Sequence, residues 1–295
     1  MSGALAIHLG VDGGHVVPRI TQAAGLPVAG MMLGRPSEQV AELMPRLFNL
    51  CAVAQGLAVR LSLDLPVQGA SDLSREILRD HLAKLCQHWP RFLGLEPRPL
   101  PQDWRHGGGC VAAAIWGGPR PISVRDWIVS QRGVAPILQA IANRFDAGEA
   151  VACLPALNAP LAKTAQENSP AGRMAEEPLM LQISSEFGKG PLWRAFGRLL
   201  DLSHWAEHVP VPHCIADGTA LVPAARGTYA FRARAKDGLV CALSRVTPTD
   251  HMIAPGGALE QSLASLPQAK LSQAALVVDI LDPCVPVRIE EAAHA

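Results

Sequence analysis

Close to its end the chain reads Val277-Val278-Asp279-Ile280-Leu281-Asp282-Pro283-Cys284, an apolar run that leads into an Asp-Pro-Cys step. Proline fixes its own φ and disfavours helix in the residue before it, so a sharp turn is expected at the cysteine. A thiol held at such a turn suits metal binding, because thiolates bind soft metals. It equally suits an inert core position, since free cysteine is among the most buried residue types. The stretch therefore needs a counterpart elsewhere in the chain before it predicts any chemistry.

Composition narrows the class of protein. The chain has 295 residues, of which 49% are hydrophobic and 18% are charged, so it has enough apolar residues for a sizeable core. Lys plus Arg and Asp plus Glu number 26 each, and this balance argues against nucleic acid or an anionic membrane as partner. No run approaches the roughly 18–20 apolar residues of a membrane span, and the first residues do not resemble a signal peptide.

The cysteines point to a reducing compartment. There are seven, scattered along the chain, and no two form a C-x-x-C pair, which removes the strongest zinc and redox signatures. An odd, scattered set with no export signal predicts a cytoplasmic protein with reduced thiols.

The order of the expected elements predicts an α+β fold. Alternating residues and a glycine-containing turn predict one hairpin over residues 4–20 and another over 228–246. Helical spacing predicts helices over 71–89, from Ser123 to near Gly148, and over 187–208. Residues 163–178 are polar with little to bury, and predict a mobile loop. We expect one domain over residues 1–295, a central helical bundle with the N-terminal and C-terminal hairpins sharing a small sheet.

Several short motifs carry potential ligands. His204-Trp205-Ala206-Glu207-His208 matches H-x-x-E-H, in which two histidines one helical turn apart grip zinc and the glutamate acts as base. The alternative is a helix end whose histidines complement the helix dipole, and Pro210 stops the segment at once. The pairs His213-Cys214 and His106…Cys110 are similar, because ten histidines produce such coincidences freely.

A second constellation joins the closing stretch to distant segments. It combines Arg46…Cys51 with Asp282-Pro283-Cys284, and between them lie Ala225-Arg226-Gly227 and Thr247-Pro248-Thr249. These segments offer two thiols, a guanidinium with several donors and a hydroxyl at a turn. Such a set suits a metal that carries small anionic ligands. Spacing alone leaves open that the four segments are unrelated.

These segments resemble the large subunits of nickel–iron hydrogenases. That family carries R-x-C-G-x-C-x-x-x-H near its N-terminus and D-P-C-x-x-C-x-x-H at its C-terminus, and this chain matches them over 46–55 and 282–290. The resemblance extends to the Asp-Gly-Gly turn of the first hairpin, to Arg226-Gly227, to Lys236-Asp237-Gly238 and to Val246-Thr247-Pro248-Thr249. The order of the matches is the same throughout, and the similarity is weakest from about residue 95 to 215.

The departures from the family pattern remove half of its metal ligands. Phe48 stands where the first cysteine of the first motif belongs, and Val287 where the last cysteine of the second belongs. Gln55 and Glu290 replace the two motif histidines. The family holds nickel among four thiolates, so we expect no nickel here. The chain is also much shorter than a catalytic large subunit, and the C-terminal extension that a maturation protease removes looks absent.

A shortened large-subunit relative with half the ligands is similar to the hydrogenase expression/formation proteins of the HupK/HoxV type. That resemblance implies a non-catalytic maturation scaffold that carries iron with two cyanide ligands and one carbonyl ligand towards the large subunit precursor, with a small maturation chaperone as a further partner. It implies transient iron binding by Cys51 and Cys284, with Arg226, Pro248 and Thr249 around the cyanide ligands.

Two points stay open at this level. Cys51 matches a cysteine that bridges both metals, whereas Cys284 matches one that binds nickel only, so iron either sits displaced or takes a ligand from elsewhere. The alternative functions are a minimal hydrogenase-like redox enzyme and a zinc hydrolase that uses His204 and His208.

Overall fold

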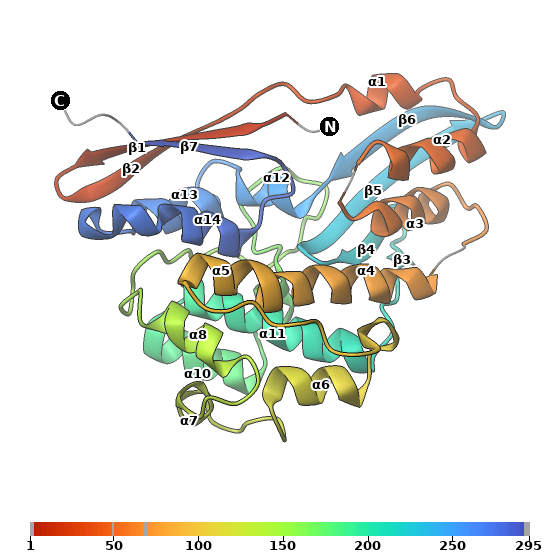
Figure 1. The fold of residues 1–295 in the computed structure, drawn as a ribbon. Helices are drawn as coiled ribbons and strands as arrows, with labels where there is room; N and C mark the ends of the chain where they lie inside the picture. Colours follow the sequence, from red (N-terminus) through yellow and green to blue (C-terminus); the bar gives the residue numbers. More distant parts are fainter. Residues whose placement is uncertain (1–2, 49, 68–69, 292–295) are drawn as a thin grey trace.

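The computed structural model describes residues 3–48, 50–67 and 70–291. Two small sheets lie along one side of the molecule, and helices pack beneath them (Figure 1). None of the described helices has both the length and the apolar composition that crossing a membrane demands. The mixture of separate helices and small sheets confirms the predicted α+β class.

The first sheet contains both ends of the chain. Strands β1 (Leu5–Asp12) and β2 (His15–Gln22) form the predicted antiparallel hairpin, and β7 (Val287–Glu291) pairs with β1 in parallel. Gly13 and Gly14 make the turn with positive φ values of 54° and 82°. Leu5, Ile7 and Leu9 of β1 are buried, as period-two patterning requires, whereas Val11 beside the turn is exposed.

The second sheet has four strands in the order β3-β4-β5-β6, all antiparallel. Its strands are β3 (His213–Cys214), β4 (Ala220–Ala224), β5 (Gly227–Lys236) and β6 (Leu239–Val246). The predicted hairpin over 228–246 is present, but the expectation that both hairpins share a sheet is wrong. The N-terminal hairpin pairs instead with β7, a strand that sequence patterning missed, because a parallel partner lies far away in the sequence.

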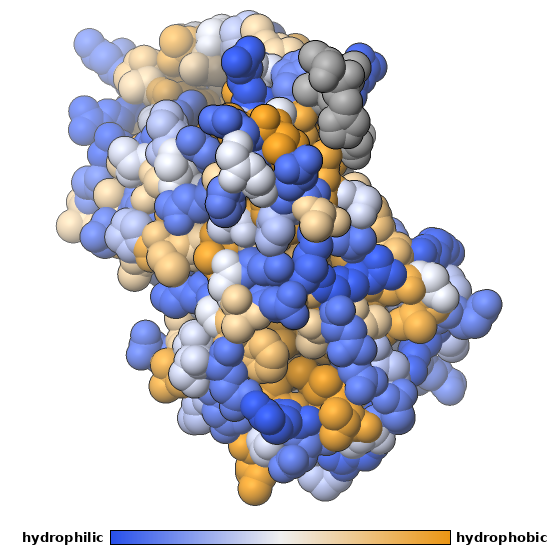
Figure 2. Space-filling view, turned by 90° about the vertical axis from the view of Figure 1, so that its left-hand side faces the viewer, coloured by the Kyte–Doolittle hydropathy of each residue, from blue (hydrophilic) through white to orange (hydrophobic). Residues whose placement is uncertain are grey.

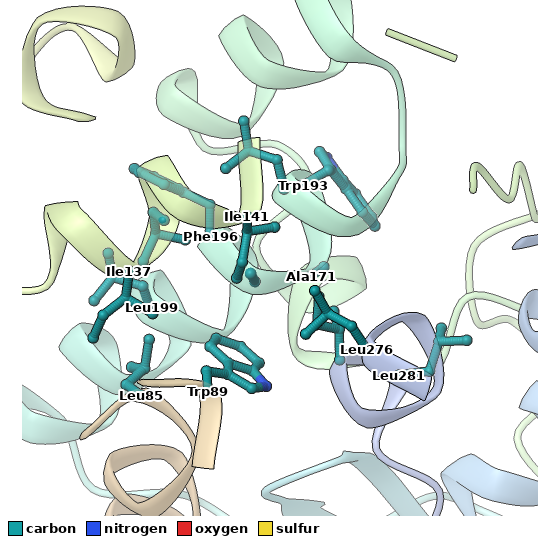
Figure 3. Packing of buried hydrophobic residues seen from close by; sticks show 14 of the residues in the cluster. Leu85, Trp89, Ile137, Ile141, Ala171, Trp193, Phe196, Leu199, Leu276 and Leu281 are labelled. Atoms are coloured by element: carbon teal, nitrogen blue, oxygen red, sulfur yellow. The ribbon is translucent and has the colours of Figure 1, made fainter. Parts of the chain in front are cut away.

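The longest of the described helices packs among the other helices, beneath the two sheets (Figure 1). Helix α11 (Pro191–Glu207), expected over 187–208, contacts α4 (Ala70–Ala83), α8 (Ala135–Ala142) and α14 (Ala274–Leu281). Figure 3 shows Phe196 and Leu199 of α11 beside Ile137 and Ile141 of α8, within one cluster that also contains residues of α14. Fourteen of its seventeen residues are buried, so α11 serves as the core around which the other helices pack.

Two other predicted helices are interrupted. The helix expected over 71–89 is α4 followed by a π-helical turn, Lys84–His88, and by α5 (Trp89–Leu93). The single helix expected from Ser123 to near Gly148 is two helices, α7 (Val124–Val129) and α8. Helix α7 ends at Val129, and the chain then passes through left-handed conformations at Gln131 and Gly133, with φ of 59° and 50°. A Cβ at Gly133 would collide with the Ile115 carbonyl, so this position requires glycine.

The remaining helices are short. They are α1 (Val28–Met32), α2 (Ser37–Leu43), α3 (Ala52–Ser62), α6 (Gly109–Trp116), α9 (Pro170–Arg173), α10 (Pro178–Phe187), α12 (Pro248–Met252) and α13 (Ala258–Ala264), with 3₁₀ turns at Met44–Arg46, Trp104–His106 and Gln268–Gln273.

The polar segment 163–178 packs into the molecule. Gln166, Glu167 and Asn168 are each less than 10% exposed, and α9 lies against α11. The Glu167 carboxylate pairs with the buried Arg194 guanidinium at 3.1 Å. The expectation that this segment has little to bury is therefore wrong, and so is the reason for predicting a mobile loop. Buried ion pairs and amide hydrogen bonds take the place of apolar contacts.

The described core consists of two hydrophobic clusters. One lies among the helices and the first sheet, and the other lies between α3 and the second sheet. Helix α4 contributes Leu73 and Ile77 to the second cluster and Leu78 and Leu82 to the first, and thus joins the two clusters.

On the face of the molecule that Figure 2 shows, polar and hydrophobic residues are interspersed, and hydrophobic residues gather in a hollow of its lower half.

Candidate functional site

Cys284 follows a helix that ends abruptly. Helix α14 stops at Leu281 because Asp282 adopts the left-handed conformation, with φ of 57°. The backbone N–H of Cys284 donates to Thr249 Oγ1 at 2.9 Å, and the Thr249 hydroxyl donates to Cys284 Sγ at 3.0 Å. Thr249 lies on α12, which begins with a buried Pro248 and is capped by reciprocal bonds between Thr247 and Asp250. One hydroxyl therefore fixes both the backbone and the sulfur of Cys284.

Cys51 stands at the start of α3 in a left-handed conformation, with φ of 53°. It supplies no side-chain cap to the helix. The Glu76 carboxylate of α4 supplies it instead, accepting from Val53 N at 2.9 Å and from Ala54 N at 3.1 Å. A carboxylate at a helix N-terminus also opposes the positive end of the helix dipole. A residue 25 positions along the chain thus holds the turn that presents the Cys51 thiol.

Arg226 connects the two cysteine segments. Its Nη1 lies 3.6 Å from Cys51 Sγ and 3.1 Å from the Asp80 carboxylate, and its Nε lies 3.1 Å from the Asp282 carboxylate. The following residue, Gly227, has φ of +143°, and a Cβ there would collide with Asn168. Glycine at this position therefore lets β5 approach closely enough for Arg226 to reach the site.

Asp282 is the centre of a buried charge network. Besides Arg226, it pairs with Arg198 at 3.0 Å and with Lys84 at 3.1 Å. Burial alone would raise the pKa of this carboxyl, but the three cations, led by Arg226, hold the pKa well below its usual range. The carboxylate therefore stays ionised and keeps Arg226 directed at Cys51.

The Cys51 thiol is protonated when no metal is bound. Burial raises the pKa of Cys51 to about 12; the Arg226 charge opposes this rise, and negative charges on Glu76, Asp80 and Cys284 add to it. The contribution from Cys284 places the two thiols within electrostatic reach of one another. A metal that binds here must displace the Cys51 proton, so binding depends on pH.

A cavity of about 640 Å³ opens beside Cys284. Its walls come from the chain after β2, from the segment before Cys51, from the α12 region and from the Cys284 segment. The lining residues are Gly3, Gln22–Leu26, Val28, Leu47, Phe48, Leu50, Gln55, Arg245, Thr247, Thr249, Asp250 and Cys284–Pro286. This volume is in the range of small-ligand pockets, and gives a route between Cys284 and solvent.

The geometry brings together the residues singled out from the sequence. Arg226 donates to the sulfur of Cys51, and Thr249 donates to the sulfur of Cys284. The ion pair between Arg226 and Asp282, two residues before Cys284, connects the two cysteine segments. Pro248 is the buried first residue of α12, next to Thr249, and does not itself line the cavity. Metal binding by the two cysteines, and contact of Arg226, Pro248 and Thr249 with the metal's ligands, stay predictions.

Comparison with known proteins identifies the family. No family model matches the chain. It is 56% identical over 295 residues to the hydrogenase expression/formation protein HupK of Rhodobacter capsulatus, with 100% of each chain covered. The chain belongs to the HupK family of hydrogenase expression/formation proteins. A second member, from Azotobacter vinelandii, is 25% identical over 318 residues, covering 89% of this chain and 90% of the relative.

Solved structures of hydrogenases share the fold. A [NiFeSe] hydrogenase variant from Desulfovibrio vulgaris Hildenborough matches with a TM-score of 0.58 at 13% identity, covering 96% of this chain and 99% of the other. The reduced Ni-Fe-Se hydrogenase from Desulfomicrobium baculatum matches with a TM-score of 0.57 at 12% identity, covering 94% and 95%. These matches confirm the predicted hydrogenase-like fold of this HupK-family chain.

The residues that replace hydrogenase ligands divide into two groups. Phe48 and Gln55 line the cavity with Cys284. Val287 and Glu290 lie in β7, where Val287 pairs with Leu5 and Glu290 forms an exposed ion pair with His8 at 3.2 Å. Of these four positions, two therefore line the cavity and two lie in the first sheet.

The histidine motifs lie elsewhere. His208 is outside α11, in extended conformation, and its ring stacks on His204 with centroids 4.4 Å apart. His213 and Cys214 are exposed in β3, and Cys110 donates to the Gly107 carbonyl. Within residues 3–48, 50–67 and 70–291, no three or more His, Cys, Asp or Glu side chains form a group that could hold a metal ion.

Sequence reasoning missed the charged residues that support the site. Glu76 and Asp80 of α4 and Lys84, the first residue of the π-helical turn that follows it, repeat every four residues, and all three reach the site or Asp282. Arg198 on α11 bridges Asp282 to His81, whose other ring nitrogen lies 2.7 Å from Asp201. The available signal was a row of charges at helical spacing, but such a row is also typical of a solvent-exposed face, so the sequence did not show that these residues are buried.

Proposed function

We propose that this protein is an accessory, non-catalytic scaffold of hydrogenase maturation, acting in the cytoplasm. It holds iron that carries two cyanide ligands and one carbonyl ligand, and passes this unit to the hydrogenase large subunit precursor, with a small maturation chaperone as partner. Membership of a hydrogenase expression/formation family supports the general role. The single observation that carries the iron proposal is the convergence of Cys51, Arg226, Thr249 and Cys284.

The donor set suits a cargo that brings its own ligands. Two thiols are soft ligands, and they suit iron with strong-field diatomic ligands. The described part of the chain offers no third metal-binding side chain in a group with them. An iron ion held at two protein positions is easier to release than one held by a full protein ligand set, which suits delivery.

The two hydrogen-bond donors suit the cyanide nitrogens. Arg226 carries a permanent positive charge, and its Nη1 faces Cys51 while Asp80 and Asp282 hold the rest of the guanidinium. Thr249 presents its hydroxyl beside Cys284. A cyanide ligand on iron between the thiolates would find a charged donor on one side and a hydroxyl donor on the other.

Proton competition favours release. Because the pKa of the Cys51 thiol is raised to about 12, the thiol takes back its proton readily at neutral pH when iron departs. The cavity beside Cys284 supplies the exit. Iron therefore stays bound only while its ligands and both sulfurs are in place.

Infrared spectroscopy of anaerobically purified protein, co-expressed with the maturation machinery, tests the proposal. Cyanide and carbonyl bound to iron give bands where protein does not absorb. We expect bands for the wild type, for Cys110→Ala and for His204→Ala, and their loss in Cys51→Ala and Cys284→Ala. Cys110→Ala is the matched control, because Cys110 is exposed and lies on α6, on the side of the helices away from the two sheets (Figure 1).

Two outcomes contradict the proposal. A wild-type protein without bands that copurifies with stoichiometric zinc, lost in His204→Ala, would indicate a zinc hydrolase. Hydrogen oxidation by the purified protein alone, lost in Cys51→Ala, would indicate a hydrogenase-like enzyme.

A further inference from the structure

Phe48 and Arg245 form a stacked pair at the position where the hydrogenase-like motif has its first cysteine. Phe48 stands at the first cysteine position of the hydrogenase-like motif, and the guanidinium carbon of Arg245 lies 4.4 Å from its ring centroid. Both side chains are half-buried, and both line the cavity that contains Cys284 and Thr249. A cation on an aromatic face is worth about 0.5–2 kcal/mol, depending on its desolvation. The ring thus holds a positive charge at the edge of the proposed iron site.

This charge is not neutralised by a neighbouring acid. Among the described residues, Arg245 has no carboxylate within 4.0 Å. Asp250 lines the same cavity, but its Oδ2 accepts from both the backbone N–H and the hydroxyl of Thr247, at 2.7 Å each, and Lys163 lies 3.8 Å from its Oδ1. Burial raises the pKa of the Tyr229 hydroxyl to about 12, and the neighbouring Arg245 charge opposes this rise. A neutral phenol leaves the guanidinium charge uncompensated, and the hydroxyl makes no hydrogen bond of normal geometry. The Arg245 guanidinium is therefore available to a ligand that accepts hydrogen bonds.

Electrostatics decides which ligand this cavity accepts. A guanidinium is always protonated, so Arg245 repels a divalent cation and attracts anionic acceptor atoms. Nickel would meet this repulsion and an aromatic ring in place of a thiolate. The nitrogen atoms of iron-bound cyanide would meet a planar donor. Phe48 and Arg245 therefore weaken the binding of a bare nickel ion and strengthen the binding of iron that carries cyanide.

We propose that Arg245, stacked on Phe48, is the specificity-determining residue of the site. Its positive charge takes the place of a second metal and restricts the Cys51–Cys284 site to one iron that carries anionic ligands. This inference rests on the proposed function and names the basis of its selectivity.

Nickel titration of the iron-free full-length chain tests the inference. The variants are Phe48→Cys, Phe48→Cys with Arg245→Gln, and Phe48→Cys with Arg245→Lys, and the probe is Ni²⁺ alone, followed by calorimetry and thiolate-to-nickel absorption. We expect Phe48→Cys with Arg245→Gln to bind nickel about tenfold or more tightly than Phe48→Cys, as expected for one partly screened unit charge. The lysine variant should bind as weakly as Phe48→Cys, because it keeps the charge. Equal nickel affinity for the glutamine and lysine variants would overturn the inference.

A second measurement does not depend on how well Phe48→Cys folds. In iron-loaded protein with Phe48 intact, Arg245→Gln should shift the cyanide bands, whereas the exposed-surface change Arg234→Gln on β5 should leave them in place. Unshifted cyanide bands in Arg245→Gln would overturn the inference while leaving the proposed function standing. A wild type with no cyanide or carbonyl bands would contradict the proposed function. The nickel titration would then still test, on its own, whether the Arg245 charge weakens nickel binding.

Discussion

At the scale of single residues, Asp282 combines a backbone role with an electrostatic one. Its left-handed conformation ends α14, which aspartate tolerates better than most side chains. Its carboxylate holds Arg226, Arg198 and Lys84 in a buried network. The residue before Pro283 therefore sets both where Cys284 lies and where Arg226 points.

Asp282→Asn should lower the free energy of unfolding by about 3–5 kcal/mol at neutral pH, because it leaves three buried cations without their carboxylate. Asparagine also tolerates the left-handed conformation, so the loss of unfolding free energy measures the effect of removing the charge. Asp64→Asn is the matched control, since Asp64 has φ of 53° but is exposed, and it should cost little. Urea unfolding measures both; an equal effect of the two changes would contradict the network's importance.

The same variant makes a pH prediction. The pKa of Asp282 is lowered in the folded protein, so its stabilisation is present above the unfolded pKa of about 4 and is lost as the pH falls. The stability difference between the wild type and Asp282→Asn should therefore be constant from about pH 5 to 7 and shrink below about pH 4. Urea midpoints collected across this range check it; a difference that grows in acid would refute this account.

At the scale of elements, α3 and α4 form one unit. Helix α3 begins at Cys51 without a cap from its own segment, and Glu76 of α4 binds its first N–H groups. Glu76 and Asp80 of α4, with Lys84 at the start of the π-helical turn that continues it, place three charges against three different parts of the site. The orientation of one helix thus determines both the helix start at Cys51 and the position of Arg226.

Glu76→Ala should lower the free energy of unfolding by about 1–2 kcal/mol, the usual cost of losing a helix cap. It should also speed the alkylation of Cys51, because the turn that encloses the thiol loosens. Glu76→Gln keeps one acceptor oxygen and should fall between the wild type and Glu76→Ala. Glu42→Ala, on the exposed side of α2, is the control. Urea unfolding and mass spectrometry of labelled protein measure these effects; unchanged Cys51 labelling would contradict the capping role.

At the scale of the whole molecule, the first sheet joins the two ends of the chain next to the site. Strand β7 begins three residues after Cys284 and pairs in parallel with β1, and Leu5 N donates to the Pro286 carbonyl at 2.8 Å. Helix α14 before Cys284 packs in the helical cluster. Cys284 is therefore held between a helix on one side and a sheet on the other.

Deleting residues 287–295 should release the N-terminal hairpin, because β1 loses its parallel partner and exposes a buried edge. Limited trypsin digestion should then cut at Arg19 much faster than in the full chain. Deleting 292–295 removes no described strand residue and is the control. Equal cleavage rates for the two truncations would show that β7 does not hold the hairpin.

Much of the local structure follows from the sequence. The two hairpins, the Ser123 cap of α7 and the end of α14 before Pro283 all depend on residues within a few positions of each other. Order and motif similarity also predicted the segments that meet at the site. Alternation and capping act over one or two turns of chain, so they can be seen in a single sequence.

The tertiary structure alone decided the rest. Only the folded chain shows that the hairpins lie in separate sheets, that β7 pairs with β1, and that Arg245 stacks on Phe48. It also shows that Arg226 lies 3.6 Å from a sulfur 175 residues away. Strand pairing and buried ion pairs depend on which distant segments meet. That choice minimises the free energy of the whole chain, and no local pattern encodes it.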